Sequence, residues 1–148
     1  MTRVRIIGKE DVSLEYELVT SQTAREALSS YERVESEVEI RNSVVYRTSS
    51  LGGALASLND LDWYLTRYAR FSEVLEPSVS THEWLSRSLA RNLYEREVDP
   101  EDTTEYYLVR GVVDGELREP VYGKEEPPEY DLYDTDDVTV TRISEDEF

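Results

Sequence analysis

The sequence predicts a compact α+β fold, with about three helices packed on a mixed or antiparallel sheet and a C-terminal β-hairpin. Apolar residues recur at helical spacing in three stretches and alternate with polar residues in several others, and an Asp-Gly pair joins two of the alternating segments. A chain of 148 residues fits one domain and can bury a core. We therefore expect a single domain over residues 1–143, followed by a loose acidic tail over residues 144–148.

The N-terminal part of the chain contains both kinds of pattern. Residues 3–7 are apolar enough to form a short strand. Large apolar residues alternate with polar ones over residues 13–18, which favours a second strand. Thr23 and Glu26 match a capping box, so a first helix is predicted from about residue 21 to residue 32.

The two elements that follow are predicted from longer patterns. Charged residues alternate with Val, Ser and Ile over residues 34–40, a period of two that predicts a half-buried strand, continued by residues 44–46. Ser50 is a suitable N-cap for the longest helix, over about residues 51–71, because the leucines of that segment fall in one broad stripe.

A third helix is predicted over about residues 81–95. Ser80 and Glu83 form a second capping-box match at its start. Leu85 and Leu89 are four residues apart, so they would mark its buried side.

The C-terminal part reads as strands and turns. Residues 106–113 and 116–122 flank the pair Asp114-Gly115, a strong hairpin signal because both central positions of that turn need positive φ. An acidic, proline-containing connector follows at about residues 123–130. Alternation over residues 138–143 predicts a final strand.

Charge is the most unusual property of the composition. The chain carries 33 acidic and 16 basic side chains, a net charge of -17, and only two of the bases are lysines. The charge is uneven, since residues 1–94 carry a net -3 and residues 95–148 a net -14. Exposed carboxylates repel one another less at molar salt, where the Debye length falls to about 3 Å. We interpret the composition as adaptation to high salt.

Several classes of function are excluded or disfavoured. The chain has no cysteine, so it cannot form disulfides, use thiolate chemistry or bind zinc through cysteine. It shows neither a signal peptide nor an apolar stretch long enough to span a membrane, and we expect a cytoplasmic location. We predict no cofactor and no metal site. Nucleic-acid binding is disfavoured because few bases would have to overcome a strongly negative field.

One hypothesis for function is a small enzyme with a carboxylate site. Asp62 falls inside the apolar stripe of the longest predicted helix, where a carboxylate needs a partner or a raised pKa. Asp60 and the single histidine, His82, are the other candidates for catalysis. The structural alternative is that Asp62 pairs with an arginine and that His82 packs near the core.

The preferred hypothesis is a binding or protein-interaction module. Two groups of tryptophan and arginine side chains fall on consecutive predicted helices, away from their leucines, and these residue types are enriched at interfaces. The groups are Trp63, Arg67 and Arg70, and Trp84, Arg87 and Arg91. They would contact a protein partner or a second copy of the chain. The alternative is that the C-terminal hairpin covers both tryptophans.

A third hypothesis concerns the acidic stretch over residues 130–137. Its carboxylates and tyrosines could imitate a nucleic-acid backbone toward a basic partner protein. Solvated acidic surface in a salt-adapted protein is the alternative explanation.

Four segments carry a resemblance to a known group of proteins: residues 58–65, 75–79, 83–87 and 129–132. In these the chain resembles an uncharacterised family of small proteins from halophilic archaea, over most of its length. The resemblance implies a haloarchaeal, cytoplasmic setting. It transfers no functional residue, because these segments are not catalytic signatures and the family has no assigned activity.

Overall fold

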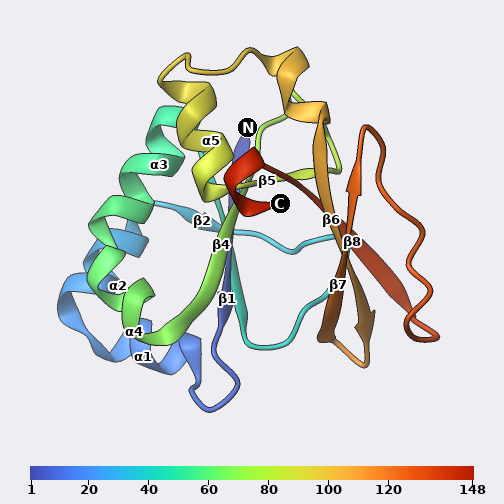
Figure 1. Ribbon diagram of the computed structural model, residues 1–148. Coiled ribbons are helices and arrows are strands. Elements are labelled where there is room, and N and C mark those ends of the chain that lie inside the picture. The colour runs from blue at the N-terminus through green and yellow to red at the C-terminus, as the bar shows by residue number, and fades with distance from the viewer.

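The computed structural model describes residues 1–148 and contains five α-helices and eight strands (Figure 1). The helices are α1 (Leu14–Thr20), α2 (Gln22–Ser29), α3 (Leu51–Asp60), α4 (Asp62–Tyr68) and α5 (Arg87–Tyr94). The strands are β1 (Thr2–Gly8), β2 (Glu32–Arg33), β3 (Ser43–Thr48), β4 (Ala69–Leu75), β5 (Trp84–Ser86), β6 (Tyr106–Val113), β7 (Glu116–Lys124) and β8 (Asp137–Ile143). Two short 3-10 helices are η1 (Pro100–Thr104) and η2 (Glu145–Glu147).

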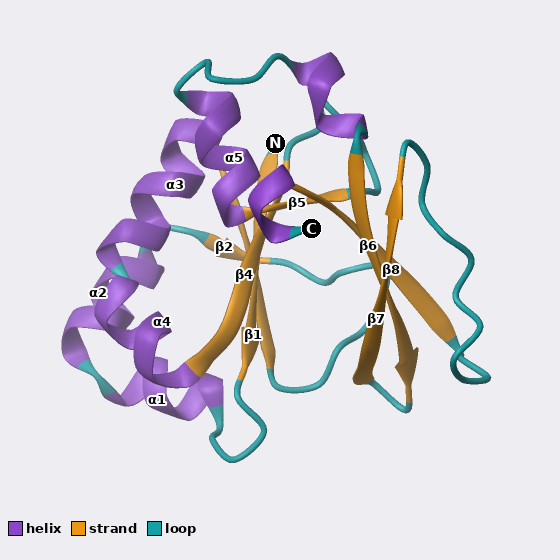
Figure 2. Ribbon diagram, in the orientation of Figure 1, coloured by secondary structure: helices purple, strands orange, loops and turns teal.

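All strands belong to one sheet, in the order β2-β3-β1-β4-β5-β8-β6-β7. Neighbouring strands are antiparallel, except that β5 and β8 are parallel. The helices gather beside β1 and β4, whereas β6, β7 and β8 form the opposite side of the molecule (Figure 2). The predicted α+β class is confirmed, with a mixed sheet, but the number of helices is five and not three.

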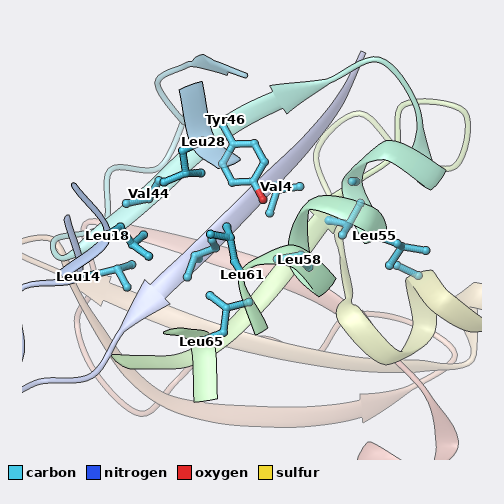
Figure 3. Packing of buried hydrophobic residues seen from close by; sticks show 14 of the residues in the cluster. Val4, Leu14, Leu18, Leu28, Val44, Tyr46, Leu55, Leu58, Leu61 and Leu65 are labelled. Carbon is cyan, nitrogen blue, oxygen red and sulfur yellow. The ribbon is translucent and has the colours of Figure 1, made fainter. Parts of the chain in front are cut away.

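The main core lies between the helices and β1, β3 and β4. Figure 3 shows leucines of the helices meeting Val4 and Tyr46 of the sheet. The Tyr46 hydroxyl is buried here and lies 2.6 Å from the hydroxyl of Ser57 on α3. Each large apolar side chain buried in this way contributes about 1.5–3 kcal/mol. This core fixes the position of β1 and β4 and therefore of the side chains on their other face.

The other face of β1 and β4 is also an interior, because the sheet curls. Side chains alternate along β1, so Ile6 points into the main core and Ile7 points to the other face. There Ile7 packs against Ile40, which precedes β3, and against Val112, which belongs to β6. The backbone of residue 41 closes the curl, since its N–H donates to the Gly115 carbonyl at 2.7 Å. Figure 1 shows the segment between β2 and β3 reaching toward the β6–β7 end of the sheet.

The strand predicted over residues 13–18 is wrong, because these residues lie largely in α1. Leu14 and Leu18 are buried and Tyr16 is exposed. Two buried positions four residues apart fit one turn of helix as well as they fit a period of two. The pattern was too short to separate the two alternatives.

The strand predicted over residues 34–40 is also wrong, because β2 ends at Arg33. The alternation still reports burial. Val34 packs on the cluster around Trp84, and Ile40 packs on Ile7, while the glutamates between them are exposed. The segment crosses the open face of the curled sheet, where no neighbouring strand runs beside it to form a ladder.

The helix predicted over residues 51–71 begins where expected but ends early. The Ser50 side chain accepts from the N–H of Gly53, as an N-cap does. The helix breaks at Leu61, and α4 then ends at Tyr68 because the following residues pair with β1. The break places Asp62 on the surface and not in the apolar stripe.

The helix predicted over residues 81–95 begins six residues late. The Ser80 hydroxyl does accept from the N–H of Glu83, but within a turn that leads into β5. Ser86 is the real N-cap, since its hydroxyl accepts from the N–H of Leu89. Pairing of residues 84–86 with β4 and β8 outweighs the local capping pattern.

The tail predicted over residues 144–148 is ordered by contacts. Ser144 and Glu147 form a capping box in η2, and Glu147 accepts from the Ser86 hydroxyl at 2.6 Å. The ring of Phe148 lies 5.1 Å from that of Tyr106. Glu147 also lines the cavity described next.

Candidate functional site

A cavity of about 440 Å³ lies on the inner face of the curled sheet, beside α4 and the start of α5. Its other walls come from β4, β5, β6, β8 and Glu147. Ligand sites typically have volumes of about 300–1,000 Å³. Three arginines line it, and we name it the arginine cavity after them: Arg70, Arg87 and Arg110.

Arg110, on β6, is partly buried and has no acidic partner. Its guanidinium carbon lies 4.2 Å from the centroid of the Phe71 ring, and the five ion pairs of the protein do not include it. Burial lowers the pKa of the Arg110 guanidinium, the nearby Glu73 carboxylate opposes this, and the positive charge of Arg70 lowers the pKa further. The group nevertheless stays protonated, as arginine does in proteins.

Arg70, on β4, is the second unpaired cation. Its guanidinium carbon lies 5.9 Å from the same Phe71 ring. It also lines a neighbouring cavity of about 340 Å³, together with Arg41 and Arg118, which form no ion pair either. Acidic side chains outnumber basic ones two to one in this chain, so a shortage of carboxylates does not explain why these arginines are unpaired.

Arg87, at the start of α5, has protein partners. It donates to the Asp62 carboxylate at 3.0 Å and to the Asn59 side chain at 3.1 Å. Its Nε is buried without an acceptor. These bonds join α5 to the end of α3 and the start of α4, so Asp62 holds the wall of the cavity in place.

Two further carboxylates of the cavity wall, the buried Glu73 and the exposed Glu147, have protein donors. Glu73 is buried and accepts from Arg5 and from the Thr141 hydroxyl. Glu147 accepts from the hydroxyls of Ser86 and Ser144 and from a backbone N–H. Glu73 is therefore paired with a cation, whereas Glu147 is bonded to neutral donors only. Arg70 and Arg110 are the arginines of the cavity that have no ion-pair partner.

The first predicted tryptophan-arginine group is at the surface. Trp63, on α4, is 55% exposed, and the guanidinium carbon of Arg67 lies 3.6 Å from its ring centroid. Arg67 also donates to the Trp63 carbonyl. Arg70 belongs to β4 and faces the arginine cavity, so it does not join this pair.

The second predicted group is not a helix face. Trp84 lies in β5, is 6% exposed and packs beneath the Arg5 guanidinium at 4.2 Å. Arg87 is directed to Asp62, and Arg91 is exposed on α5. The sequence predicts these three residues on one helix face, but residues 84–86 form a strand and only Arg87 and Arg91 lie in α5.

The three candidates for catalysis do not lie in one cavity. Asp62 lines the arginine cavity, and His82 lines a separate one beside Trp84. Asp60 is exposed at the end of α3.

No group of three or more acidic or histidine side chains is arranged to hold a metal ion. No helix combines the length and the apolar character needed to cross a membrane.

Sequence reasoning missed Arg5, Glu73 and Arg110. Each is a charged residue inside an apolar strand segment, and in a strand with two buried faces a charge is costly unless it is paired. That signal was present in the sequence, but it does not say which of these residues meet.

Comparison with known proteins gives one match. The model of a family described as "Family of unknown function (DUF5804)" matches residues 2–112, which include all of β1 to β5, all five α-helices and most of β6. Neither a curated protein nor a solved structure matches the chain.

Proposed function

Because the chain belongs to the DUF5804 family, whose function is unknown, we propose a function from the side-chain arrangement alone: the protein is a binding module for a small anion. The proposed ligand is a small oxyanion with at least two negative charges, such as a phosphate ester or a dicarboxylate. It occupies the arginine cavity, and no chemical step is assigned to it.

The convergence of two unpaired arginines on Phe71 carries this proposal. Arg70 is exposed and Arg110 is partly buried, and the positive charge of Arg70 lowers the pKa of Arg110 because the two charges repel each other. Partial burial of Arg110 means that water screens this repulsion less than it would between two fully exposed groups. An anion between Arg70 and Arg110 relieves that repulsion and forms charge-assisted hydrogen bonds with both guanidinium groups. The Phe71 ring keeps Arg110 in place, which reduces the entropy lost on binding.

The volume of the cavity and the negative electrostatic field of the protein favour a small ligand over a polymer. A net charge of -17 repels a long polyanion, whereas a small anion meets mainly the local charges of the cavity. A volume of about 440 Å³ admits a metabolite but not a folded partner. Nucleic acid remains disfavoured as a ligand because the negative charge of the protein repels it.

Calorimetric titration tests the proposal. Inorganic phosphate and succinate serve as probes, at about 0.1 M KCl and again at about 2 M, because screening should weaken binding. The Arg70→Gln/Arg110→Gln variant should bind at least about tenfold more weakly than the unchanged protein, since each charge-assisted bond contributes about 1.5–3 kcal/mol.

Arg91→Gln is the matched control, because it removes the same charge from an exposed arginine outside the cavity. Thermal unfolding of each variant verifies that it is folded. The proposal fails if neither probe binds, or if Arg91→Gln weakens binding as much as a substitution in the cavity does.

Surface contact through Trp63 is a second candidate function, favoured by its 55% exposure beneath Arg67. Such a contact would join the protein to a partner or to a second copy. Light scattering at increasing concentration, with Trp63→Ala for comparison, tests self-association. A molecular mass that stays monomeric at all concentrations would exclude contact with a second copy of the chain.

A further inference from the structure

A second cavity lies on the same inner face, beyond the Arg5–Glu73 ion pair. Its volume is about 390 Å³, and we name it the tryptophan cavity after Trp84. Arg5 lines this cavity and Glu73 lines the arginine cavity. Strand β8 also contributes to both cavities, since Thr139 lines the tryptophan cavity and Thr141 lines the arginine cavity.

Arg5 has unused hydrogen-bonding capacity at this cavity. Its side chain is only 1% exposed. Its Nε and Nη2 donate to the Glu73 carboxylate, and Nη2 also donates to the Thr139 hydroxyl at 2.8 Å. Nη1 is buried and has no acceptor. A buried charged donor without an acceptor is costly, so its presence indicates a missing partner.

The geometry of the guanidinium shows where that partner belongs. Nε and Nη2 form the edge that faces Glu73, so Nη1 lies on the other edge and points away from it. The Trp84 ring covers the plane of the group, with its centroid 4.2 Å from the guanidinium carbon. Of the two cavities, Arg5 lines only the tryptophan cavity. The tryptophan cavity is therefore the side from which an acceptor for Nη1 is expected.

The remainder of the lining indicates an apolar body for the ligand. Leu75 and Trp84 are buried side chains of this wall, and Val38 and Val140 add further apolar surface. Arg3 supplies a second guanidinium. One acidic side chain, the exposed Glu37, also lines the cavity.

We propose that the tryptophan cavity binds a carboxylic acid with an apolar body, its carboxylate accepting from Arg5 Nη1 and its body lying against Trp84 and Leu75. This site is independent of the arginine cavity and takes a different class of ligand. The carboxylate supplies the missing acceptor, and the apolar body leaves water.

Fluorescence of Trp84 measures binding directly. The chain has two tryptophans, so Trp63→Phe leaves Trp84 as the single reporter. The probes are 3-phenylpropionate and 3-phenylpropan-1-ol, which share the apolar body and differ in charge. The acid should give a saturable change and bind at least about tenfold more tightly than the alcohol. Equal affinity for the two probes, or no saturable change with the acid, overturns the proposal.

A substitution beside the site provides the second test, because Arg5→Gln is expected to disturb the buried ion pair. Ser36 lines the cavity, in a segment whose alternate residues, Val34 and Val38, face inward. Ser36→Glu should weaken binding of the acid about tenfold by repelling its carboxylate. Ser49→Glu adds the same charge at an exposed position outside the cavity and should leave binding unchanged. Equal effects of the two substitutions contradict the proposal.

The Arg70→Gln/Arg110→Gln variant separates the two cavities. It should bind 3-phenylpropionate as the unchanged protein does, whether or not the arginine cavity binds phosphate. Loss of acid binding in this variant would place the acid in the arginine cavity and overturn the assignment to the tryptophan cavity.

Discussion

Arg5 and Glu73 lie directly opposite each other on β1 and β4 and form an ion pair of 2.7 Å, with both side chains buried. The helices cover the other face of these strands, so the pair lies inside the curl of the sheet. Each partner lines a different cavity. The pair is therefore both a structural link between β1 and β4 and the boundary between two candidate sites.

Glu73→Gln should destabilise the protein strongly. The substitution leaves the Arg5 charge buried without its carboxylate, which typically costs about 3–5 kcal/mol. Urea unfolding measures the loss. Glu32→Gln is the control, because it breaks the more exposed Arg47–Glu32 pair and should cost at most about 1 kcal/mol. Similar losses for the two variants would show that the buried pair contributes little.

Glu147→Gln should strengthen anion binding in the arginine cavity. Glu147 contributes a negative charge to the cavity wall, and glutamine retains the size and an acceptor oxygen for the Ser86 hydroxyl. If the proposed function is correct, phosphate should bind several-fold more tightly because one repulsive charge is removed. The same substitution at the exposed Glu101 of η1 should have no effect. Weaker binding in Glu147→Gln would contradict the placement of the ligand.

Stability should fall at alkaline pH, in part because of Tyr46. Burial raises the pKa of the Tyr46 phenol well above its ordinary value of 10.0, and the hydrogen bond to Ser57 opposes this. The neutral phenol is thus favoured in the folded protein, so its contribution is complete below pH 10 and is lost as the pH rises above that value. Unfolding in urea between about pH 9 and pH 12 should show this decline, and Tyr46→Phe should show a smaller one. An identical slope in Tyr46→Phe would assign the decline to other groups.

Gly111→Ala should be destabilising. A methyl group at Gly111, on β6, would lie 2.4 Å from Thr135 and 2.5 Å from the ring of Tyr130, so the segment after β7 would have to move. Overpacking of this kind costs about 1–3 kcal/mol. Gly53→Ala is the comparison, because its nearest neighbour is 3.3 Å away and alanine favours helix by about 1 kcal/mol. Thermal unfolding should show a clearly larger loss of stability for Gly111→Ala than for Gly53→Ala.

Salt should stabilise the protein. Mutual repulsion of exposed carboxylates is screened as KCl rises from about 0.1 M to about 2 M, so the melting temperature should increase over that range. A melting temperature that stays constant or falls would contradict adaptation to high salt. The effect should be larger than for a protein of the same size with balanced charge.

Local sequence patterns predicted local structure well where the interactions that stabilise an element lie within a few residues of it. Ser50 begins α3 as expected, because its cap involves only residues three positions away. Residues 13–18 and 81–86 were assigned wrongly because a short pattern fits more than one structure. In the second case, pairing with β4 and β8 decided the outcome, and those strands are distant in sequence.

The candidate sites depended on tertiary structure to a greater degree. Arg5 and Glu73 are 68 residues apart, and no local pattern relates them. Trp63 is exposed, which is one of the two alternatives that the sequence left open, whereas Trp84 is buried and lies in a strand that the sequence did not indicate.

By itself, the sequence determined the α+β class, the charge of -17 and the absence of cysteine chemistry, since these follow from composition and from short-range periodicity. Only the tertiary structure decided which arginines lack partners. Strand order brings Arg110 of β6 and Arg70 of β4 to one ring and places Arg5 against Trp84. The physical reason is that a charge is paired or unpaired according to distances in space, and those distances are set by long-range strand pairing.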